Sequence, residues 1–384
     1  MRVRRYTSIH QVPESLWDSL LGDDHPYHAH RLIRAVEDAR VEDSRFWMLL
    51  FYDGERLVAT AVLSAFTVSL DIFLGKGLQK LVALVRKVFP RCFRVDVLFC
   101  GLPASFGQNN LVLADGVPAR ALLELLVREM ESIAGEEGLR FFSIKEFKEH
   151  ELPKVADLEP LGFFRGHSVP YMSMEIRWQS FDEYLASLRH PYRRHVLRSL
   201  AKMGMTRPEV HAFSSNGDPH LILGGPEVMS PGRFCQLYRN VMARTETRLE
   251  MLNEAFFERL WLELGAELRI LAAVADGEVL GAALLLKSGT TLNFMLVGLP
   301  ATSQTPHDIY FNLLYAILDQ AIRQNCERLN LGQTAYWGKQ QIGGVPEEEF
   351  LFFKAANRSL HAVLRGLRRI LFPRLRLPSP RVFK

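Results

Sequence analysis

The sequence predicts a protein of the α/β (α+β) class with two tandem domains, each a mixed β-sheet flanked by helices. The 384 residues are too many for one ordinary core and fit two domains of typical size. Hydrophobic residues make up 48% and charged residues 23% of the chain, a balance typical of globular proteins. An internal repeat indicates that the same order of elements occurs twice.

Two short motifs mark the repeat. Asp53-Gly54 and Asp276-Gly277 each stand between two apolar segments, and Asp-Gly is a strong signal for a tight β-hairpin turn. A Gly-Leu-Pro-Ala sequence follows each hairpin, at residues 101–104 and 298–301. The spacing between the motifs is longer in the first copy, where apolar residues at helical spacing predict an inserted helix over residues 73–94.

Each copy then continues with a long helix and an apolar strand. The predicted helices cover residues 117–137 and 307–325, and the predicted strands cover residues 139–147 and 328–333. A strand–helix–strand crossover implies parallel pairing, whereas the preceding hairpin implies antiparallel pairing, so we expect a mixed sheet in each domain. The expected organisation is a first domain over residues 1–177, a second over residues 178–356 and a C-terminal segment over residues 357–384.

The C-terminal segment is basic and amphipathic. It carries eight basic residues and no acid, whereas the whole chain has a formal charge of only +4, which gives no reason to expect DNA binding. Leu360, Leu364, Leu367 and Leu371 share one face of a predicted helix that Pro373 ends. Such a helix packs on the protein, lies on an anionic membrane surface or contacts tRNA, and the sequence leaves these three interpretations open.

Signatures of several other protein classes are absent. The N-terminal residues lack the apolar core of a signal peptide and no apolar stretch is long enough to span a membrane, so we expect a cytoplasmic protein, at most peripheral on the inner face of the membrane. The chain has no Gly-x-Ser-x-Gly elbow, Walker loop or Gly-x-Gly-x-x-Gly, which argues against a serine hydrolase, a P-loop NTPase and a Rossmann dehydrogenase. The spacing of His25, His28 and His30 fits no common zinc site, so we expect no metal.

Three degenerate motifs carry a resemblance to a known family. They are DHPYHAH at residues 24–30 with the helix start after it, SFDEYLASL at residues 180–188 with the arginines after it, and LGQTAYWGKQQIGG at residues 331–344. With the repeated order of hairpin, strand, helix and strand, they resemble the GNAT acyltransferase superfamily. Among its tandem-domain members, the chain is most similar to the Fem-type transferases and to relatives described as peptidoglycan biosynthesis/recognition proteins. The resemblance covers most of residues 20–354.

The resemblance implies an N-acyltransferase. Its donor co-substrate would be an acyl-CoA or an aminoacyl-tRNA, and its acceptor would be an amine on a cell-envelope precursor or a small metabolite. Many GNAT enzymes bind the CoA pyrophosphate with a glycine-containing loop, but residues 300–308 contain no glycine, so both donors remain open. The alternative is a catalytically inactive GNAT-like module that recognises an envelope precursor or a sugar.

The same resemblance places the reacting carbonyl where two parallel strands diverge, here residues 295–298 beside residues 329–333. Gln333 and Tyr336 follow the second of these strands directly, at the end where ligands bind in open α/β sheets, so we expect catalytic roles for both, with Tyr336 protonating the leaving group. The expected donor-binding residues are Val297, Gly298, Tyr310 and Asn312. Each of these side chains could instead be a packing or strand-end residue without a catalytic role.

Charged and polar residues near the strand ends are candidates for binding the substrate. Lys339 lies between Gly338 and Gly343-Gly344, and glycine on both sides suggests a chain path close to a ligand. The expected substrate-binding residues are Lys145, Glu146, Arg193, Arg194, Thr334 and Lys339. The alternatives are a solvated loop lysine, a surface ion pair and a solvated helix face. We expect the catalytic centre in the second domain and a structural or acceptor-binding role for the first.

Overall fold

The computed structural model describes residues 1–22, 25–69, 85, 94–211, 218–245, 250–302 and 307–384. The chain divides into two compact units. The first comprises Met1–Val169, Thr247–Leu252 and Glu348–Leu375, and the second comprises Pro170–Glu246, Asn253–Glu347 and Arg376–Lys384. Among the described residues, no helix is both long enough and apolar enough to cross a membrane.

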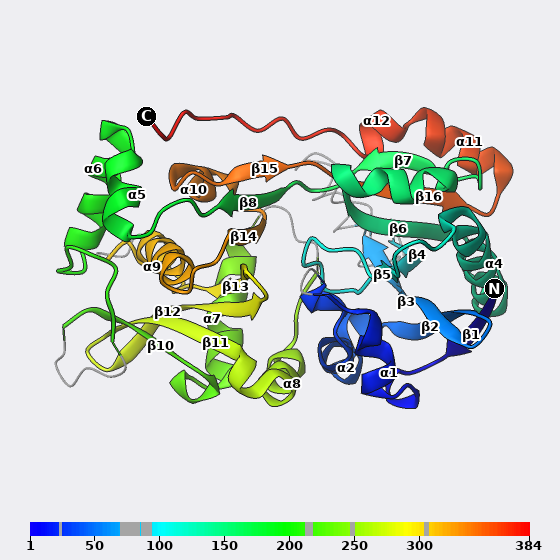
Figure 1. Cartoon of the computed structure of the whole chain (residues 1–384), viewed down its shortest axis with the longest axis horizontal. Helices are drawn as coiled ribbons and strands as arrows, with labels where there is room; N and C mark the ends of the chain where they lie inside the picture. The colour runs from blue at the N-terminus through cyan, green and yellow to red at the C-terminus, as the bar shows by residue number, and fades with distance from the viewer. Residues whose placement is uncertain (23–24, 70–84, 86–93, 212–217, 246–249, 303–306) are drawn as a thin grey trace. The chain divides into compact units, whose positions relative to one another are not determined.

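The first unit is built on a mixed sheet in the order β1-β2-β3-β4-β6-β16-β7, with β5 paired to β3 (Figure 1). All neighbouring strands are antiparallel except β4 and β6. The strands are β1 (Arg2–Tyr6), β2 (Arg45–Asp53), β3 (Arg56–Ser69), β4 (Arg94–Cys100), β5 (Leu111–Leu113), β6 (Phe141–Lys148), β7 (Phe164–His167) and β16 (Glu349–Ala355).

Helix α4 (Ala119–Glu137) supplies much of the core of this unit. It buries Leu122, Leu126, Met130 and Ile133, which lie on one face at spacings of three and four residues. The helix ends at Gly138, whose φ of 70° is a left-handed conformation that glycine adopts without strain. The other helices of the unit are α1 (Glu14–Trp17), α2 (His30–Asp38), α11 (Arg358–Gly366) and α12 (Arg368–Leu371).

The second unit repeats this design. Its sheet has the order β15-β8-β14-β13-β12-β11-β10-β9, and only β13–β14 and β9–β10 are parallel. The strands are β8 (Tyr171–Glu175), β9 (Val210–His211), β10 (His220–Gly224), β11 (Leu268–Ala275), β12 (Glu278–Ser288), β13 (Thr291–Gly298), β14 (Arg328–Gln333) and β15 (Val345–Glu347). The helices are α5 (Phe181–Ser187), α6 (His190–Ala201), α7 (Pro231–Arg244), α8 (Glu254–Leu264), α9 (Ile309–Arg323) and α10 (Tyr336–Gln341).

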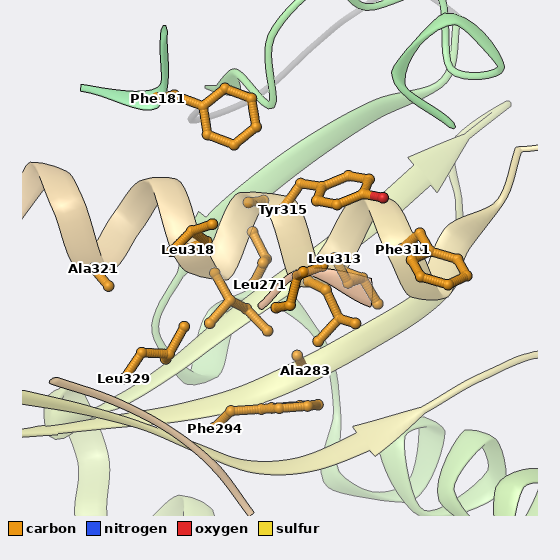
Figure 2. Packing of buried hydrophobic residues seen from close by; sticks show 14 of the residues in the cluster. Phe181, Leu271, Ala283, Phe294, Phe311, Leu313, Tyr315, Leu318, Ala321 and Leu329 are labelled. Carbon is orange, nitrogen blue, oxygen red and sulfur yellow. The ribbon is translucent and has the colours of Figure 1, made fainter. Parts of the chain in front are cut away.

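Helix α9 covers one face of the second sheet. Figure 2 shows Leu313 and Leu318 of this helix above Leu271, Ala283 and Phe294 of the strands, and all five side chains belong to one buried cluster. The helix is buried on nearly every side, which explains why its sequence is apolar around most of its circumference. This packing fixes the end of α9 that begins next to the predicted site.

The two sheets confirm the predicted repeat. In each unit a hairpin turns at Asp-Gly, a third antiparallel strand follows, and a helix leads to a strand that pairs in parallel with the third. The strand predicted over residues 328–333 has these bounds in the structure, and the predicted helices are shorter than expected by a few terminal residues. The predicted inserted helix over residues 73–94 lies almost wholly outside the described residues.

Two details differ from the sequence-based expectations. Strand β8 falls within residues 1–177, expected to form the first domain, but it pairs with β14 and β15 of the second sheet. Strand β16, placed by sequence in the second domain, pairs with β6 and β7 of the first sheet. Hydrophobic pattern identifies a strand but not its partner, so these exchanges were not visible in the sequence.

The motif that begins at Ser180 and the arginines after it form two helices. Ser180 caps the first of them by accepting a hydrogen bond from the Glu183 backbone N–H. Helix α5 ends at Ser187, and Leu188 and Arg189 are extended. Pro191 has no N–H to donate to the carbonyl group of Ser187, so a continuous helix would lose that bond. Proline is well accommodated in the first turn of a new helix, which is where it stands in α6.

Candidate functional site

The candidate site lies where β13 and β14 diverge. The two strands pair in parallel only at Thr291–Arg328, Leu292–Leu329 and Asn293–Asn330. Beyond these pairs, β13 stays with β12 as far as Gly298 and β14 stays with β8 as far as Gln333. Past Asn293, β13 therefore no longer pairs with β14.

Val297 and Gly298 stand on the far part of β13. Val297 is partly exposed, while Gly298 is buried against α7. A Cβ at Gly298 would lie 2.6 Å from Cβ of Leu237, so a larger residue would push the strand and the helix apart. The glycine of this Gly-Leu-Pro-Ala motif is thus required for helix–strand packing.

The backbone is strained immediately after β14. Thr334 and Ala335 have φ values of 59° and 48°, a left-handed conformation that costs a non-glycine residue about 1–2 kcal/mol. Helix α10 begins at the next residue, Tyr336, whose hydroxyl donates a hydrogen bond to the Pro170 carbonyl at 3.1 Å. Such strain persists where surrounding contacts fix the chain, and it is common at functional sites.

Lys339 is the most unusual side chain of the site. It belongs to α10 rather than to a solvated loop, and it is only 3% exposed. Its Nζ donates a hydrogen bond of 2.6 Å to the carbonyl oxygen of Gln333 and lies 5.9 Å from the ring centroid of Phe294. No described carboxylate compensates the charge, and burial lowers the pKa of Lys339 to about 7. The amine can therefore gain or lose a proton near neutral pH.

Tyr310 approaches the same helix from the start of α9. A Cβ at Gly338 would lie 2.6 Å from Cε1 of Tyr310, so this glycine allows α10 to contact the tyrosine ring. The Tyr310 hydroxyl is buried and has no hydrogen-bond partner among the described atoms, and burial raises its pKa. Buried hydroxyl groups are normally hydrogen-bonded, so this one is available to a bound molecule.

Asn312, expected to bind the donor, is occupied by packing contacts. The side chain is wholly buried, and its Nδ2 donates hydrogen bonds to the carbonyl groups of Ser199 and His307. These bonds join the first turn of α9 to the end of α6. The sequence could not distinguish this arrangement from an exposed amide in the first turn of the helix.

The arginines of α6 form an exposed basic ridge near the site. Arg193, Arg194 and Arg198 are exposed, and none forms an ion pair with a carboxylate in the described parts of the chain. We define this ridge as these three residues together with Arg189, the exposed N-cap of α6.

Trp337 is a further candidate residue that sequence reasoning missed. It is 64% exposed and stands in α10 between Tyr336 and Lys339. Its ring meets Phe311 edge to face at 5.6 Å, and Phe311 meets His195 of α6 at 4.5 Å. The exposed indole is therefore connected through two rings to the helix that carries the basic ridge. An exposed tryptophan cannot be recognised as exposed from the sequence alone.

Lys145 and Glu146 form a second polar cluster, within the first unit. Glu146 is 3% exposed, has a φ of 68° and lies 3.7 Å from Nζ of Lys145. The Ser105 hydroxyl donates a hydrogen bond to Glu146, and Nζ of Lys145 lies 5.6 Å from the centroid of the Phe99 ring. Burial raises the pKa of Glu146, and it raises that of the neighbouring Glu250 to about 8. The pair is thus buried, and it is not a surface ion pair.

The histidines near residue 28 have structural partners. His28 is fully buried, stacks on Trp17 at 4.9 Å and hydrogen-bonds to the Thr60 hydroxyl at 2.9 Å. Nε2 of His30 lies 2.9 Å from the carbonyl oxygen of Val12. Within the described ranges, no group of three or more histidine, cysteine, aspartate or glutamate side chains is placed to hold a metal ion.

Comparison with solved structures supports the fold. FemX is 12% identical, and the match covers 95% of this chain and 100% of that chain with a TM-score of 0.57. A tandem GNAT protein from the clavulanic acid biosynthesis pathway is 11% identical, with 93% and 99% of the two chains covered and a TM-score of 0.51. These likenesses establish two tandem GNAT-like domains, each a mixed sheet flanked by helices.

Comparison with known sequences identifies the family. A Mycobacterium tuberculosis protein provisionally named 8-amino-7-oxononanoate synthase 2 is 24% identical over 333 residues, which cover 84% of this chain and 41% of that protein. The chain therefore spans about two fifths of the length of the curated relatives that it matches. The FemAB-like family model, described as peptidoglycan biosynthesis/recognition, matches residues 98–366, well over half of the sequence. The chain belongs to the FemAB-like family.

Proposed function

We propose that the protein is an N-acyltransferase that moves an acyl or aminoacyl group from an activated donor to an amine. The donor is an acyl-CoA or an aminoacyl-tRNA, and the acceptor is a cell-envelope precursor or a small metabolite. Lys339 carries this proposal, because it places a buried amine with a pKa of about 7 where β13 and β14 diverge. Membership of a peptidoglycan biosynthesis/recognition family supports an acceptor from the cell envelope.

The site offers the groups that acyl transfer needs. The acceptor nitrogen attacks the donor carbonyl carbon, forming a C–N bond and breaking a C–S bond of CoA or a C–O bond of tRNA. Of residues 295–297, those whose backbone N–H groups point away from β12 would stabilise the oxyanion. The acceptor amine must lose a proton and the leaving group must gain one. Lys339 would take the proton from the acceptor amine, Tyr336 would give its hydroxyl proton to the leaving group, and the proton on Lys339 would then restore Tyr336, while Gln333 orients the carbonyl group.

Replacement of Lys339 tests this assignment. General acid–base groups contribute about 10²–10⁴-fold to rate, so Lys339→Met should lower kcat/KM by that factor and remove the inflection of the pH–rate profile near 7. Transfer should be followed in single turnovers with a panel of acyl-CoA and aminoacyl-tRNA donors. Lys287→Met, which removes an exposed lysine from β12, is the matched control. Equal rates in the Lys339→Met variant and the wild type would refute a proton-carrying role.

Trp337 and the basic ridge would bind the donor nucleotide. Both acyl-CoA and aminoacyl-tRNA carry an adenosine joined to phosphates, which suits an exposed indole and the unpaired arginines of α6. Stacking of a base on an aromatic side chain contributes about 1–3 kcal/mol. Trp337→Ala should therefore weaken donor binding by about fivefold to a hundredfold or more.

Two probes distinguish the donors in this experiment. Free CoA and a tRNA acceptor-stem minihelix ending in adenosine should be titrated against Trp337→Ala and against Arg193→Gln with Arg194→Gln. The control is Leu262→Ala, which truncates a side chain that is 68% exposed on α8. The natural donor is the probe whose binding both variants weaken. Unchanged binding of both probes would remove the ridge and Trp337 from the site.

We assign transfer to the second domain, within residues 178–356, and acceptor recognition to the first, within residues 1–177. Lys145 and Glu146 support this assignment, because a buried carboxylate beside a lysine can bind a cationic amine or a carboxylate of a peptide. Contact of residues 357–384 with the inner face of the membrane would bring lipid-linked acceptors within reach. Lys145→Gln should then raise the KM for the acceptor and leave the KM for the donor unchanged.

A catalytically inactive binding module is the second candidate. A cavity of about 520 Å³ in the second unit favours it, because Trp178 and Phe383 line it together with Arg328 and Glu347. Aromatic rings with charged groups around them are suited to a sugar or a short peptide. A binding module would retain a muropeptide in equilibrium dialysis, lose it in Trp178→Ala, and show no transfer with any donor. Turnover by the wild type excludes this alternative.

A further inference from the structure

Helices α11 and α12 present an apolar stripe to solvent. Leu360, Val363, Leu367 and Ile370 recur at i, i+3, i+7 and i+10, and they are 37%, 57%, 43% and 73% exposed. Backbone hydrogen bonds from Leu367 to Val363 and from Leu371 to Leu367 carry the helical path across the short break between α11 and α12. Residues at this spacing lie on one face of a helix, so the four side chains form one continuous surface, here called the apolar stripe.

A different face holds these helices on the first unit. The backbone N–H of Ala355 donates to Nδ1 of His361 at 3.2 Å, and the His361 ring lies 5.4 Å from that of Phe164 in β7. Phe372 lies 5.7 Å from Phe353 in β16, and a Cβ at Gly166 would come within 2.8 Å of it. His361 and Phe372 thus hold the helices on the first unit, and the apolar stripe takes no part in this packing and remains exposed.

The helices that carry the stripe are strongly basic. All four of their arginines are exposed: Arg358, Arg365, Arg368 and Arg369. None of them forms an ion pair with a described carboxylate, and residues 357–384 contain no acid. A helix with an exposed apolar face and uncompensated positive charge on its polar face is complementary to a surface that is apolar inside and negatively charged outside.

We propose that α11 and α12 dock on an anionic lipid bilayer, with the apolar stripe among the acyl chains and the arginines at the headgroup phosphates. An amphipathic basic helix lies in the plane of the interface, and each basic residue near an anionic surface contributes a favourable electrostatic term. The arrangement observed here requires no refolding, because the stripe already faces away from the core. Membrane docking does not depend on the transfer chemistry and can be measured without a donor.

Vesicle co-sedimentation of the full chain tests the proposal. The probe is a mixture of phosphatidylglycerol and phosphatidylethanolamine, compared with phosphatidylcholine alone. Wild-type protein should bind the anionic vesicles, bind phosphatidylcholine weakly, and lose binding as salt is raised. Arg365→Gln with Arg369→Gln should weaken binding about thirtyfold, from about 1 kcal/mol for each charge. Val363→Asp with Ile370→Asp should abolish it.

Matched controls remove the same chemistry elsewhere. Arg128→Gln with Arg239→Gln takes two exposed arginines from α4 and α7, and Leu262→Asp places an acid at an exposed leucine of α8. These variants should bind vesicles within about twofold of wild type. Circular dichroism and thermal unfolding verify that all variants are folded.

Three outcomes would overturn the proposal. The first is that the stripe and arginine variants bind anionic vesicles as tightly as the wild type. The second is that the protein forms a dimer, measured by light scattering, which the stripe variants convert to monomer while vesicle binding is absent. The third is that the arginine variants lose affinity for tRNA while vesicle binding is unaffected. The last two results would assign the face to a second copy of the chain and to RNA, respectively.

Discussion

Glu250 and Glu146 show how one cluster makes stability depend on pH. Burial is the main cause of the raised pKa of Glu250, which reaches about 8, and the charges of Glu146 and Glu42 raise it further while Lys145 opposes them. A carboxyl group with this pKa is protonated in the folded protein at neutral pH but ionised in the unfolded chain. The folded state therefore binds the extra proton.

The sign of the pH dependence follows directly. Between the ordinary value of 4.5 and about 8, the folded state holds a proton at Glu250 that the unfolded chain has released. The stabilisation is complete below this window and is lost as pH rises through it, at about 1.4 kcal/mol per pH unit. Glu250→Gln should make the free energy of unfolding less dependent on pH in this window. Denaturant titrations across this window would show the change.

Glu258→Gln, on the exposed surface of α8, provides the comparison for this experiment. It should leave the pH dependence of wild-type unfolding intact. If Glu250→Gln and Glu258→Gln give the same pH slope as the wild type, Glu250 is ionised in the folded protein.

A candidate residue could be predicted from the sequence where a reactive side chain stands at a telling position, such as just past the end of a strand or between glycines. Lys339, between glycines and just past a strand end, could be selected from sequence as a candidate, but its burial could not. Burial depends on how α10 folds back beneath the strained turn, and no local pattern encodes that path. Trp337 was missed for the same reason, because an aromatic residue between Tyr336 and Gly338 is as compatible with a core as with a surface.

The turn between β14 and α10 positions the site, and its strain can be measured. Ala335 has a φ of 48°, a conformation that glycine adopts at no cost. Ala335→Gly should therefore stabilise the folded protein by about 0.5–1 kcal/mol, since relief of strain exceeds the added entropy of the unfolded chain. Thermal and denaturant unfolding should both report the gain.

The same substitution in an exposed helix should have the opposite sign. Ala255→Gly in α8 replaces a helical alanine and should cost up to about 1 kcal/mol. A turn that positions Lys339 rigidly also predicts that Ala335→Gly lowers kcat while it stabilises the protein. Destabilisation by Ala335→Gly would show that the left-handed geometry is not present in solution.

Sequence patterns located most elements correctly, and they failed where a single residue changes the path of the chain. The strand over residues 328–333 is bounded by an asparagine–cysteine turn and by the strained pair after Gln333, and both ends were predicted. The motif that begins at Ser180 and the arginines after it stand on two helices, with Leu188 and Arg189 extended between them. Pro191 explains the break, because in a continuous helix it could not donate a hydrogen bond to the carbonyl group of Ser187.

At the level of the whole molecule, the two sheets have the same strand order although two strands are exchanged. Strand β8 occupies in the second sheet the place that β16 occupies in the first, next to the strand that follows the crossover helix. The Asp-Gly turns and Gly-Leu-Pro-Ala motifs encode the repeat locally, so the sequence could predict it. The exchange joins segments far apart in the chain, and such partners require the folded structure.

The duplication also produces a pair of comparable lysines with different surroundings. Lys145 lies over the ring of Phe99, and Lys339 lies over the ring of Phe294. Phe99 belongs to the stretch of β4 that pairs in parallel with β6, and Phe294 comes directly after the stretch of β13 that pairs in parallel with β14. Lys145 has Glu146 at 3.7 Å and also attracts Glu250, whereas Lys339 has a single carbonyl partner. One lysine compensates buried carboxylates, and the other is left uncompensated at the candidate site.

These surroundings predict that the same substitution changes the stability of the two units by different amounts. Lys145→Met leaves the buried Glu146 without its cation and should destabilise the first unit by about 3 kcal/mol at neutral pH, and by less in acid, where Glu146 is protonated. Lys339→Met removes an uncompensated buried amine, so the second unit should change by no more than about 1 kcal/mol, the contribution of the lost hydrogen bond to Gln333. Hydrogen–deuterium exchange of peptides from β6 and β14 measures the two units separately. The contrary outcome is that Lys339→Met speeds exchange in β14 as much as Lys145→Met speeds it in β6. Lys339 would then have a structural role, and a loss of transfer in that variant could not be assigned to a catalytic role of Lys339.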